Sequence, residues 1–280
     1  MRFKLWTEYG ALNSAPVFEA FSSGLQKFGH TIVTKDQDVN VIWSILWKGR
    51  MLHNKQIFYD NKPVIVLEVG SIKRNSTWKV LLYNNQKMID YTANSNDTTR
   101  PNLLNIKLMP WRTKGDKILI CCQNPNSQQW YGLPQMSKWV LDTIQTIRQH
   151  TNKPIYVRQH PRSRFNFNEN KSLLIYNEIP KKIKNTYDEY DLSFENCHAV
   201  INYNSNPGVQ AILQGYPVFC DRSSIIAPVG NLDINNINKP ICPDRSEWLV
   251  KFSHTEYTIT ELEKGMPLTL LTLPLESCKI

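Results

Sequence analysis

Two arginines flank a histidine and a proline in the segment Arg158-Gln159-His160-Pro161-Arg162, directly after an apolar run that predicts a strand. Proline restricts the residue before it to extended geometry, so His160 is held in place. Guanidinium groups bind phosphate oxygens through paired hydrogen bonds. A single histidine is more often structural, but its two arginine neighbours favour a binding role. Arg158, His160 and Arg162 are therefore candidate ligands of a diphosphate.

A second polar segment, Asn204-Ser205-Asn206-Pro207-Gly208, stands between a predicted strand and a predicted short helix. Serine and asparagine cap helix N-termini, and the amides beyond a cap bind anions. A plain cap without a ligand is the alternative. Because another strand (GYPVFCD) follows the helix, the cap is expected at the same sheet edge as His160. Together the two segments predict a phosphate-bearing ligand in the second half of the chain.

The sequence offers two candidates for a general base. Glu68 ends a buried run, just before Val69-Gly70, where a carboxylate is partly removed from water and suited to accept a proton. An ion pair of Glu68 with Lys73 or Arg74 is an equally good interpretation. Glu8, in the polar loop after the first predicted strand, is the second candidate.

The loop that contains Glu8 also predicts a binding surface. Asn13 and Ser14 precede a predicted helix, so the backbone amides there are placed to receive a phosphate or a sugar hydroxyl. An ordinary loop between a strand and a helix is the alternative. The loop has neither a G-x-G-x-x-G pattern nor a P-loop lysine, which argues against dinucleotide and P-loop binding.

Positive charge is concentrated in the first part of the chain. The formal net charge is +9; residues 1–113 hold 15 basic and 8 acidic side chains, and residues 114–280 hold 18 and 16. A polyanionic partner would therefore dock mainly on the first part, although a modest excess also serves solubility. Within the segment 71–91, cations alternate with rings that stack on bases. The side chains assigned to this nucleic-acid surface are Lys73, Arg74, Trp78 and Lys79, with Tyr83 and Tyr91 as further rings or as strand core.

Length and composition exclude several classes of protein. The 280 residues are 41% hydrophobic and 20% charged, which is enough to build cores. The mean hydropathy is −0.42, and no stretch approaches the roughly 18 apolar residues of a membrane helix. The first residues read as a strand rather than a signal peptide. The six cysteines show no metal-site spacing, so reduced thiols in a cytoplasmic protein without a metal are expected.

Alternating strand and helix patterns predict an α/β fold with parallel sheets covered on both faces. In the first part, strands are expected at 2–6, 30–34, 39–43 and from Val64, with helices from Pro16 and over 48–59. A polar stretch places the junction near 111–114. In the second part, strands begin at Ile118, Pro154, Leu173 and His198, a long helix covers 134–150, and two helices close the chain. The expected domains are 1–113 and 114–280.

The second half resembles a known family. The His160-Pro161 dipeptide and the later pattern N-S-x-P-G-x-x-A-x-x-x-G-x-P-V are similar to the nucleotide-binding half of GT-B glycosyltransferases, especially capsule-polysaccharide and sialyltransferase-like enzymes. The resemblance implies two Rossmann-like domains that face each other across a cleft. It also implies that His160 and Ser205 contact the donor nucleotide, while Arg158 and Arg162 neutralise its diphosphate in place of a metal.

Two departures from that family are visible. The family's acidic pair before a glycine appears here as Glu68-Val69-Gly70, with valine in place of one acid. The glutamate that grips the donor ribose is missing from the helix after the serine loop, where Gln210 is the substitute. The donor-binding set is then Arg158, His160, Arg162, Asn204, Ser205, Asn206, Gly208 and Gln210.

The whole chain also resembles glycosyltransferase-like proteins of tailed phages, through EVGSIKRNSTWKV, QNPNSQQW and PDRSEWL. That resemblance implies a monomer in the cytoplasm of an infected bacterium. It would transfer sugar from a UDP-sugar co-substrate, without other cofactors, to 5-hydroxymethylcytosine in double-stranded DNA. The base would be flipped, with Trp78 or Tyr83 filling the stack. One alternative is transfer to a surface polysaccharide or other glycan. The other is a non-catalytic nucleic-acid-binding protein on a degenerate GT-B scaffold.

Overall fold

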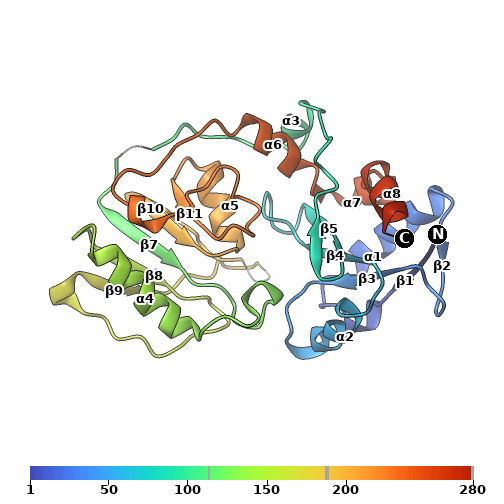
Figure 1. Cartoon of the computed structure of the whole chain (residues 1–280). Coiled ribbons are helices and arrows are strands. Elements are labelled where there is room, and N and C mark those ends of the chain that lie inside the picture. Colours follow the sequence, from blue (N-terminus) through green and yellow to red (C-terminus); the bar gives the residue numbers. More distant parts are fainter. Residues whose placement is uncertain (113, 187–188, 279–280) are drawn as a thin grey trace. The chain divides into compact units, whose positions relative to one another are not determined.

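A computed structural model describes residues 1–112, 114–186 and 189–278 (Figure 1). The chain forms two compact units: Met1–Asn105 together with Leu249–Ile280 is unit 1, and Ile106–Trp248 is unit 2. The boundary between Trp248 and Leu249 falls inside helix α6 (Ser246–Ser253). Each unit is an α/β layer structure with its own sheet, as the sequence predicts.

Unit 1 is built on a sheet with the strand order β12-β5-β4-β3-β1-β2, and β6 pairs with β5. Strands β1 to β4 are mutually parallel, whereas β5, β6 and β12 pair in antiparallel fashion. The strands of unit 1 are β1 (Arg2–Leu5), β2 (Thr31–Ile32), β3 (Val39–Trp43), β4 (Val64–Val69), β5 (Trp78–Asn84), β6 (Lys87–Ile89) and β12 (Glu256–Tyr257). The turn from β4 to β5 is too short for a parallel crossover, which explains why this part departs from the predicted all-parallel sheet.

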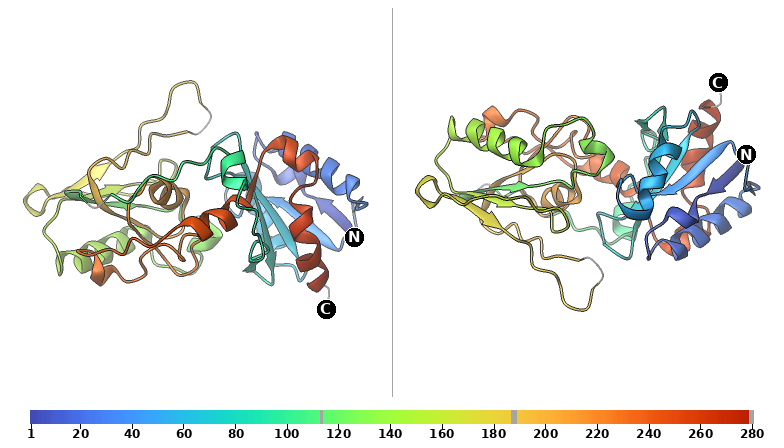
Figure 2. Two further views of the ribbon diagram at one scale, coloured as in Figure 1. Left: turned by 90° about the horizontal axis from the view of Figure 1, so that it is seen from above. Right: turned by 90° about the horizontal axis from the view of Figure 1, so that it is seen from below.

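Helices cover both faces of the unit 1 sheet. The predicted apolar face of α1 (Val17, Phe18, Phe21 and Leu25) is buried on the sheet, together with leucines of α7 and α8, which lie on the same side (Figure 2). The opposite face is covered by Ile57 and Phe58 of α2. The helical segments of unit 1 are η1 (Thr7–Tyr9), α1 (Ala15–Lys27), η2 (Gly49–His53), α2 (Asn54–Phe58), α3 (Arg100–Leu103), α7 (Ile259–Glu263) and α8 (Leu268–Ser277).

Unit 2 contains a parallel sheet with the strand order β11-β10-β7-β8-β9. Its strands are β7 (Lys117–Cys121), β8 (Ile155–Arg158), β9 (Ile175–Glu178), β10 (Cys197–Asn202) and β11 (Val218–Phe219). Helix α4 buries the predicted residues Met136, Val140, Ile144 and Ile147 against one face. The helical segments are η3 (Gln128–Trp130), α4 (Met136–Arg148), η4 (Lys171–Leu173), α5 (Asn206–Leu213) and η5 (Ile234–Asn236).

The connection between the units differs from the predicted boundary at residue 113. Thr113 itself lies outside the described residues. The preceding segment is bound to unit 2: the amide of Met109 donates to the Leu213 carbonyl at 2.9 Å, and Arg245 donates to the Met109 carbonyl at 2.6 Å. Arg245 also lies over the Trp111 ring, 3.9 Å from its centroid. Unit 2 therefore begins at Ile106 rather than at 114.

The end of the chain, expected in the second domain, belongs to unit 1. Arg100, whose side chain is 2% exposed, donates to the carbonyls of Ser253 and Glu256 and forms an ion pair with Glu261 at 3.0 Å. The Glu256 carboxylate accepts hydrogen bonds from the Ser71 and Ile72 amides and from the Thr77 hydroxyl. These contacts join residues more than 150 positions apart, so no local pattern in the sequence indicates them.

Candidate functional site

The carboxyl edge of the unit 2 sheet is the first candidate site. From β7 the chain runs to β8 and β9 on one side and later to β10 and β11 on the other. The strand order therefore reverses between β7 and β10, where doubly wound sheets bind ligands. The predicted segments at His160 and Ser205 follow β8 and β10, so both lie at this edge.

A buried glutamine connects, by hydrogen bonds, the loops at the point where the strand order reverses. Gln123, 3% exposed, accepts a hydrogen bond from the Asn204 amide at 3.0 Å and donates to the Ser127 hydroxyl at 2.8 Å. Asn204 also donates through its side chain to the Ser223 carbonyl at 3.2 Å. The loops after β7, β10 and β11 are thus held in one arrangement. The sequence analysis assigned no site role to Gln123, although a polar residue directly after a buried strand can indicate a binding site.

Asn202, the last residue of β10, holds the serine loop. Its side chain donates to the Ser205 hydroxyl oxygen at 2.6 Å and accepts from the Ser205 amide at 3.0 Å. Since the hydroxyl oxygen already accepts one hydrogen bond, its own proton is oriented toward another partner. Gly208 packs so closely on the hydrogen-bonded pair of Asn202 and Ser205 that a Cβ at position 208 would lie 2.5 Å from the Asn202 side-chain oxygen. Ser205 is thereby presented as a hydrogen-bond donor at the edge.

The predicted anion site on the amides of α5 is only partly formed. Ser205 makes no side-chain cap, its amide is used by Asn202, and the Gly208 amide donates to the Ser205 carbonyl at 3.0 Å. Pro207 has no amide proton. Asn206 and Gln210 lie half-buried on the same helix. Side chains, rather than a row of helix amides, therefore supply the polar groups of this loop.

The His160 turn is fixed by its neighbour Gln159. The Gln159 side chain is 5% exposed, accepts from the Phe165 amide at 2.8 Å and donates to the Asn177 side chain at 3.1 Å. Nδ1 of His160 accepts from the Arg162 amide at 3.2 Å. In the neutral ring the proton is then on Nε2, which is a hydrogen-bond donor. Arg162 is exposed at this edge and adds a positive charge to it.

Arg158 does not take the position that the sequence predicts. Its side chain is 3% exposed, and it donates to the Glu178 carboxylate at 2.7 Å and to the Ser193 carbonyl. The guanidinium lies 5.3 Å from the Phe194 ring centroid. Burial raises the pKa of the adjacent Cys121 thiol to about 11, with Arg158 opposing the shift. Because it points into the interior of unit 2, Arg158 is removed from the predicted diphosphate site.

The carboxyl edge of the unit 1 sheet is the second candidate site. Glu68 lies near the end of β4, half-buried, and its carboxylate accepts from the Ser44 hydroxyl at 2.9 Å. Ser44 follows β3 with a φ of 60°, and its hydroxyl also accepts from the Leu46 amide at 3.2 Å. A left-handed serine costs free energy, so these two hydrogen bonds help to hold it. The pair orients the Glu68 carboxylate, and Ser44 is a site residue that the sequence analysis missed.

The other predicted residues of the first loop have different roles. Glu8 is exposed on η1. The Ser14 side chain is 3% exposed and donates to the Ala11 carbonyl at 2.8 Å, while Asn13 is half-buried beside it. Ser14 therefore closes the loop on itself instead of presenting a hydroxyl to an acceptor.

The predicted nucleic-acid surface is largely core. Trp78 is 6% exposed and packs on Trp43 with ring centroids 5.9 Å apart, and Lys79 is 8% exposed. Tyr83 and Tyr91 are buried as well. Only the turn residues remain accessible, with Lys73 exposed and Arg74 half-buried. The assignment of Trp78 and Lys79 to a DNA surface is wrong, because β5 is an inner strand with both faces covered.

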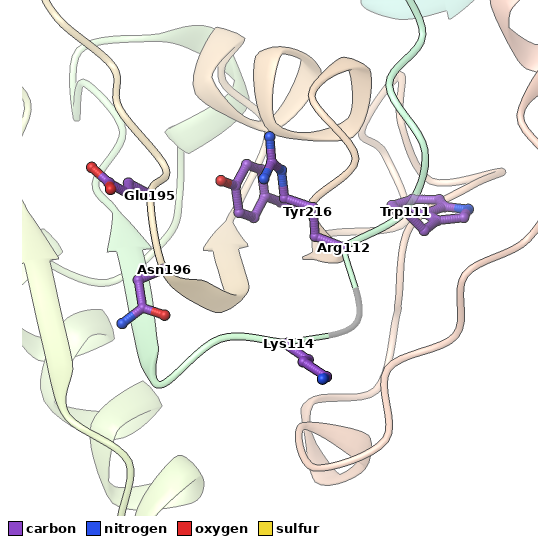
Figure 3. Close-up of a pocket in the computed structure, with 6 residues that line it drawn as sticks. All are labelled: Trp111, Arg112, Lys114, Glu195, Asn196 and Tyr216. Atoms are coloured by element: carbon purple, nitrogen blue, oxygen red, sulfur yellow. The ribbon is translucent and has the colours of Figure 1, made fainter.

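A hollow of about 620 Å³ opens at the other edge of the unit 2 sheet (Figure 3). Arg112 lies against the Tyr216 ring, 4.9 Å from its centroid, while Lys114 and Glu195 point away from each other. The residues before β7, β10 and β11 line it, so it lies at the amino ends of the strands. Its side chains do not converge on one point, and it is not the predicted donor site.

Two further kinds of feature are absent from the part of the chain that the structure describes. Among the residues that the structure describes, no three histidine, cysteine, aspartate or glutamate side chains come together as metal ligands. Within the same residues, no helix has the length and apolar character needed to cross a membrane.

Comparisons with known proteins support the fold. No protein-family model and no curated protein matches the chain. Among solved structures it is similar to Thermosulfurimonas dismutans KpsC, beta Kdo 2,7 transferase, with a TM-score of 0.50 at 15% identity, over 98% of this chain and 99% of that one. The Thermosulfurimonas dismutans KpsC, beta Kdo 2,4 transferase, matches over 92% of both chains with a TM-score of 0.46 at 11% identity. The first likeness, at 15% identity, confirms the α/β fold alone.

Proposed function

We propose that this chain is a glycosyltransferase that transfers a sugar from a nucleotide-activated donor to a hydroxyl of a glycan. The observation that carries the proposal is the carboxyl edge of unit 2, where the His160 turn follows β8 and the Asn202–Ser205 pair follows β10, the two strands that flank β7. A fold supports many activities, so the proposal depends on these side chains more than on the likeness to KpsC.

The donor is assigned to unit 2. The Ser205 hydroxyl and His160 Nε2 are hydrogen-bond donors suited to phosphate oxygens, and Arg162 adds a positive charge. Since Arg158 is committed to Glu178, one of the two expected guanidinium groups is missing from the edge. We therefore include nucleoside monophosphate sugars beside the UDP-sugars that the sequence favours. The protein is proposed to use no metal.

The chemical step is assigned to Glu68. The acceptor oxygen forms a bond to the anomeric carbon while the bond from that carbon to the phosphate oxygen breaks. The acceptor proton passes to the Glu68 carboxylate, and the electron pair leaves with the phosphate. Ser44, which donates to Glu68 at 2.9 Å, fixes the direction of that carboxylate. Glu8 is the weaker candidate because it is exposed on η1.

A glycan is proposed as the acceptor in place of 5-hydroxymethylcytosine in DNA. Burial of Trp78, Tyr83 and Lys79 removes the rings and one of the cations on which the DNA proposal depended. The similar KpsC protein is described as a Kdo transferase, which supports a sugar acceptor. Kdo-containing glycans are the first acceptors to test.

A thermal-shift screen tests donor binding. We expect a nucleotide sugar to raise the melting temperature of the wild-type protein, and Ser205→Ala and Asn202→Ala to reduce that shift. Asn152→Ala, at an exposed site outside the edge, is the control and keeps the full shift. Absence of any shift with UDP-, GDP- and CMP-sugars would favour a non-catalytic scaffold.

An activity assay tests the chemical step. With a donor that binds, Glu68→Gln is expected to lower the turnover about 10²- to 10⁴-fold, which is the usual contribution of a general base. Glu19→Gln, on the exposed side of α1, is the matched control and retains activity. Full turnover in Glu68→Gln would refute the assignment of the base.

A further inference from the structure

Three rings of unit 1 form a stacked column at the carboxyl edge of its sheet. Trp6 and Tyr9 have ring centroids 5.9 Å apart with planes inclined by 13°, and Tyr9 and His53 are 4.9 Å apart with 24° between planes. The Lys4 ammonium lies over the Trp6 ring, 3.4 Å from its centroid. The column therefore runs from a cation at one end to the imidazole of His53 at the other. His53 is exposed, and Trp6 and Tyr9 are half-buried.

The loops that carry the column are held rigidly. The Trp6 indole donates to the Asn40 side chain at 2.8 Å, and its backbone amide donates to the Val41 carbonyl at 2.9 Å. The Asn54 side chain donates to the Trp43 carbonyl at 2.8 Å. Trp6 and Tyr9 also pack on the apolar cluster beneath α2. The rings are thus presented in a fixed orientation, as a binding platform requires.

The column and Glu68 lie on the same edge and the same face of the sheet. Residues alternate between faces along a strand, so Glu68 shares the face of Val64 and Val66, which lie in the cluster that Trp6 and Tyr9 cover. β4, β3 and β1 are neighbours in that order and end at one edge. The strands that lead to Glu68 and to Trp6, β4 and β1, are therefore about 10 Å apart, which is two strand spacings. Ser44, whose backbone is in the left-handed region, directly follows β3, the strand between β4 and β1.

Two apolar side chains close in sequence to the residues of the column are exposed to solvent. Leu12, in the loop after η1, is 77% exposed, and Leu52, beside His53 in η2, is 54% exposed. Exposed apolar side chains on neighbouring loops are typical of binding surfaces. The flat apolar faces of pyranose rings stack on the faces of aromatic rings, and in this column the face of His53 turned away from Tyr9 is the one that no other ring of the column covers.

We propose that His53, which the stacked Tyr9 and Trp6 rings support from behind, is the platform on which a sugar ring of the acceptor glycan stacks, at a subsite separate from the reacting hydroxyl. This proposal rests on the proposed function, because it takes Glu68 as the catalytic carboxylate. A distance of about two strand spacings leaves room for the reacting sugar between the carboxylate and the platform. The platform selects acceptors that are longer than one sugar.

Saturation-transfer NMR on the full chain tests the platform with three tetrasaccharides: maltotetraose, cellotetraose and α2,8-linked tetra-sialic acid. We expect one of them to bind the wild-type protein, and His53→Ala to weaken that binding about three- to tenfold, as the loss of one ring pair predicts. His53→Phe keeps the ring and is expected to retain the affinity. Gln56→Ala, exposed on α2, is the control. Melting temperatures of all variants check that each is folded.

Three results would overturn the platform: no tetrasaccharide binds, His53→Ala binds as Gln56→Ala does, or the column binds an eight-residue oligothymidine more tightly than any tetrasaccharide. Donor binding, measured separately by thermal shift, distinguishes this failure from that of the proposed function. Binding of a tetrasaccharide that depends on His53, with no shift by any nucleotide sugar, would refute the transferase and leave a glycan-binding surface.

Discussion

Replacement of Arg100 by methionine tests what holds the end of the chain on unit 1. The Arg100 side chain is 2% exposed, so its loss leaves the Glu261 carboxylate and two carbonyls without their buried donor. Burial disfavours the ionised form of Glu261, but hydrogen bonds from Arg100 and Thr258 outweigh it and hold the pKa of that carboxyl below its usual value.

Removal of one partner from a buried ion pair costs about 3–5 kcal/mol. In a chain of this size, that free energy corresponds to a fall of about 10 °C in melting temperature. Thermal unfolding followed by circular dichroism measures the fall. Limited proteolysis of Arg100→Met is expected to release the segment after α6 first, because that segment loses its anchor.

A double-mutant cycle isolates the pair itself. Glu261→Gln keeps a side chain that can still close the capping box with Thr258, so the cycle of Arg100→Met with Glu261→Gln reports the ion pair. We expect a coupling free energy of about 0.5–3 kcal/mol. Arg50→Met, at an exposed arginine, is the control and changes stability by less than about 0.5 kcal/mol. A loss below about 1 kcal/mol in Arg100→Met would refute this account of the anchor.

Three further predictions follow from buried groups. Burial lowers the pKa of His254, so as the pH falls the unfolded chain binds a proton at this residue before the folded chain does. The free energy of unfolding is therefore expected to decrease as the pH drops below about 6.5. In urea unfolding between pH 7.5 and 5.5, His254→Gln should make that decrease smaller. In Gly70→Ala the new Cβ would lie 2.3 Å from the Thr77 hydroxyl oxygen, so we expect a loss of about 1–3 kcal/mol in the same assay, and a smaller loss would contradict the close packing. A pulse of iodoacetamide at pH 8 should alkylate the exposed Cys242 and leave the buried Cys121, whose pKa is about 11, unmodified by mass spectrometry.

The sequence predicted most elements because their signals are local. The apolar spacing of α1 and α4 and the buried runs of β3 and β4 appear where the structure has them. The positions of His160 and Ser205 at one sheet edge were also predictable, because the carboxyl ends of all strands in a parallel sheet lie at the same edge.

The direction and burial of individual side chains were not predictable in this way. Arg158 ends its strand as expected, but its side chain lies on the face that Phe194 covers, and it forms an ion pair with the next strand. Trp78 and Lys79 have the composition of a nucleic-acid surface, yet both sides of β5 are paired, with β4 and β12. Strand pairing and the covering of each face decide exposure, and neither is encoded in a short stretch of sequence.

By itself, the sequence determined the α/β class, the alternation of strands and helices, and the polar segments at the strand ends. Only the tertiary structure decided that the chain returns to unit 1 through Arg100 and Glu256, that Ser44 supports Glu68, and that Trp6, Tyr9 and His53 stack. Each of these depends on contacts between residues that are from 24 to more than 150 positions apart. The free energy of such contacts arises from burial in the assembled core rather than from local conformational preference.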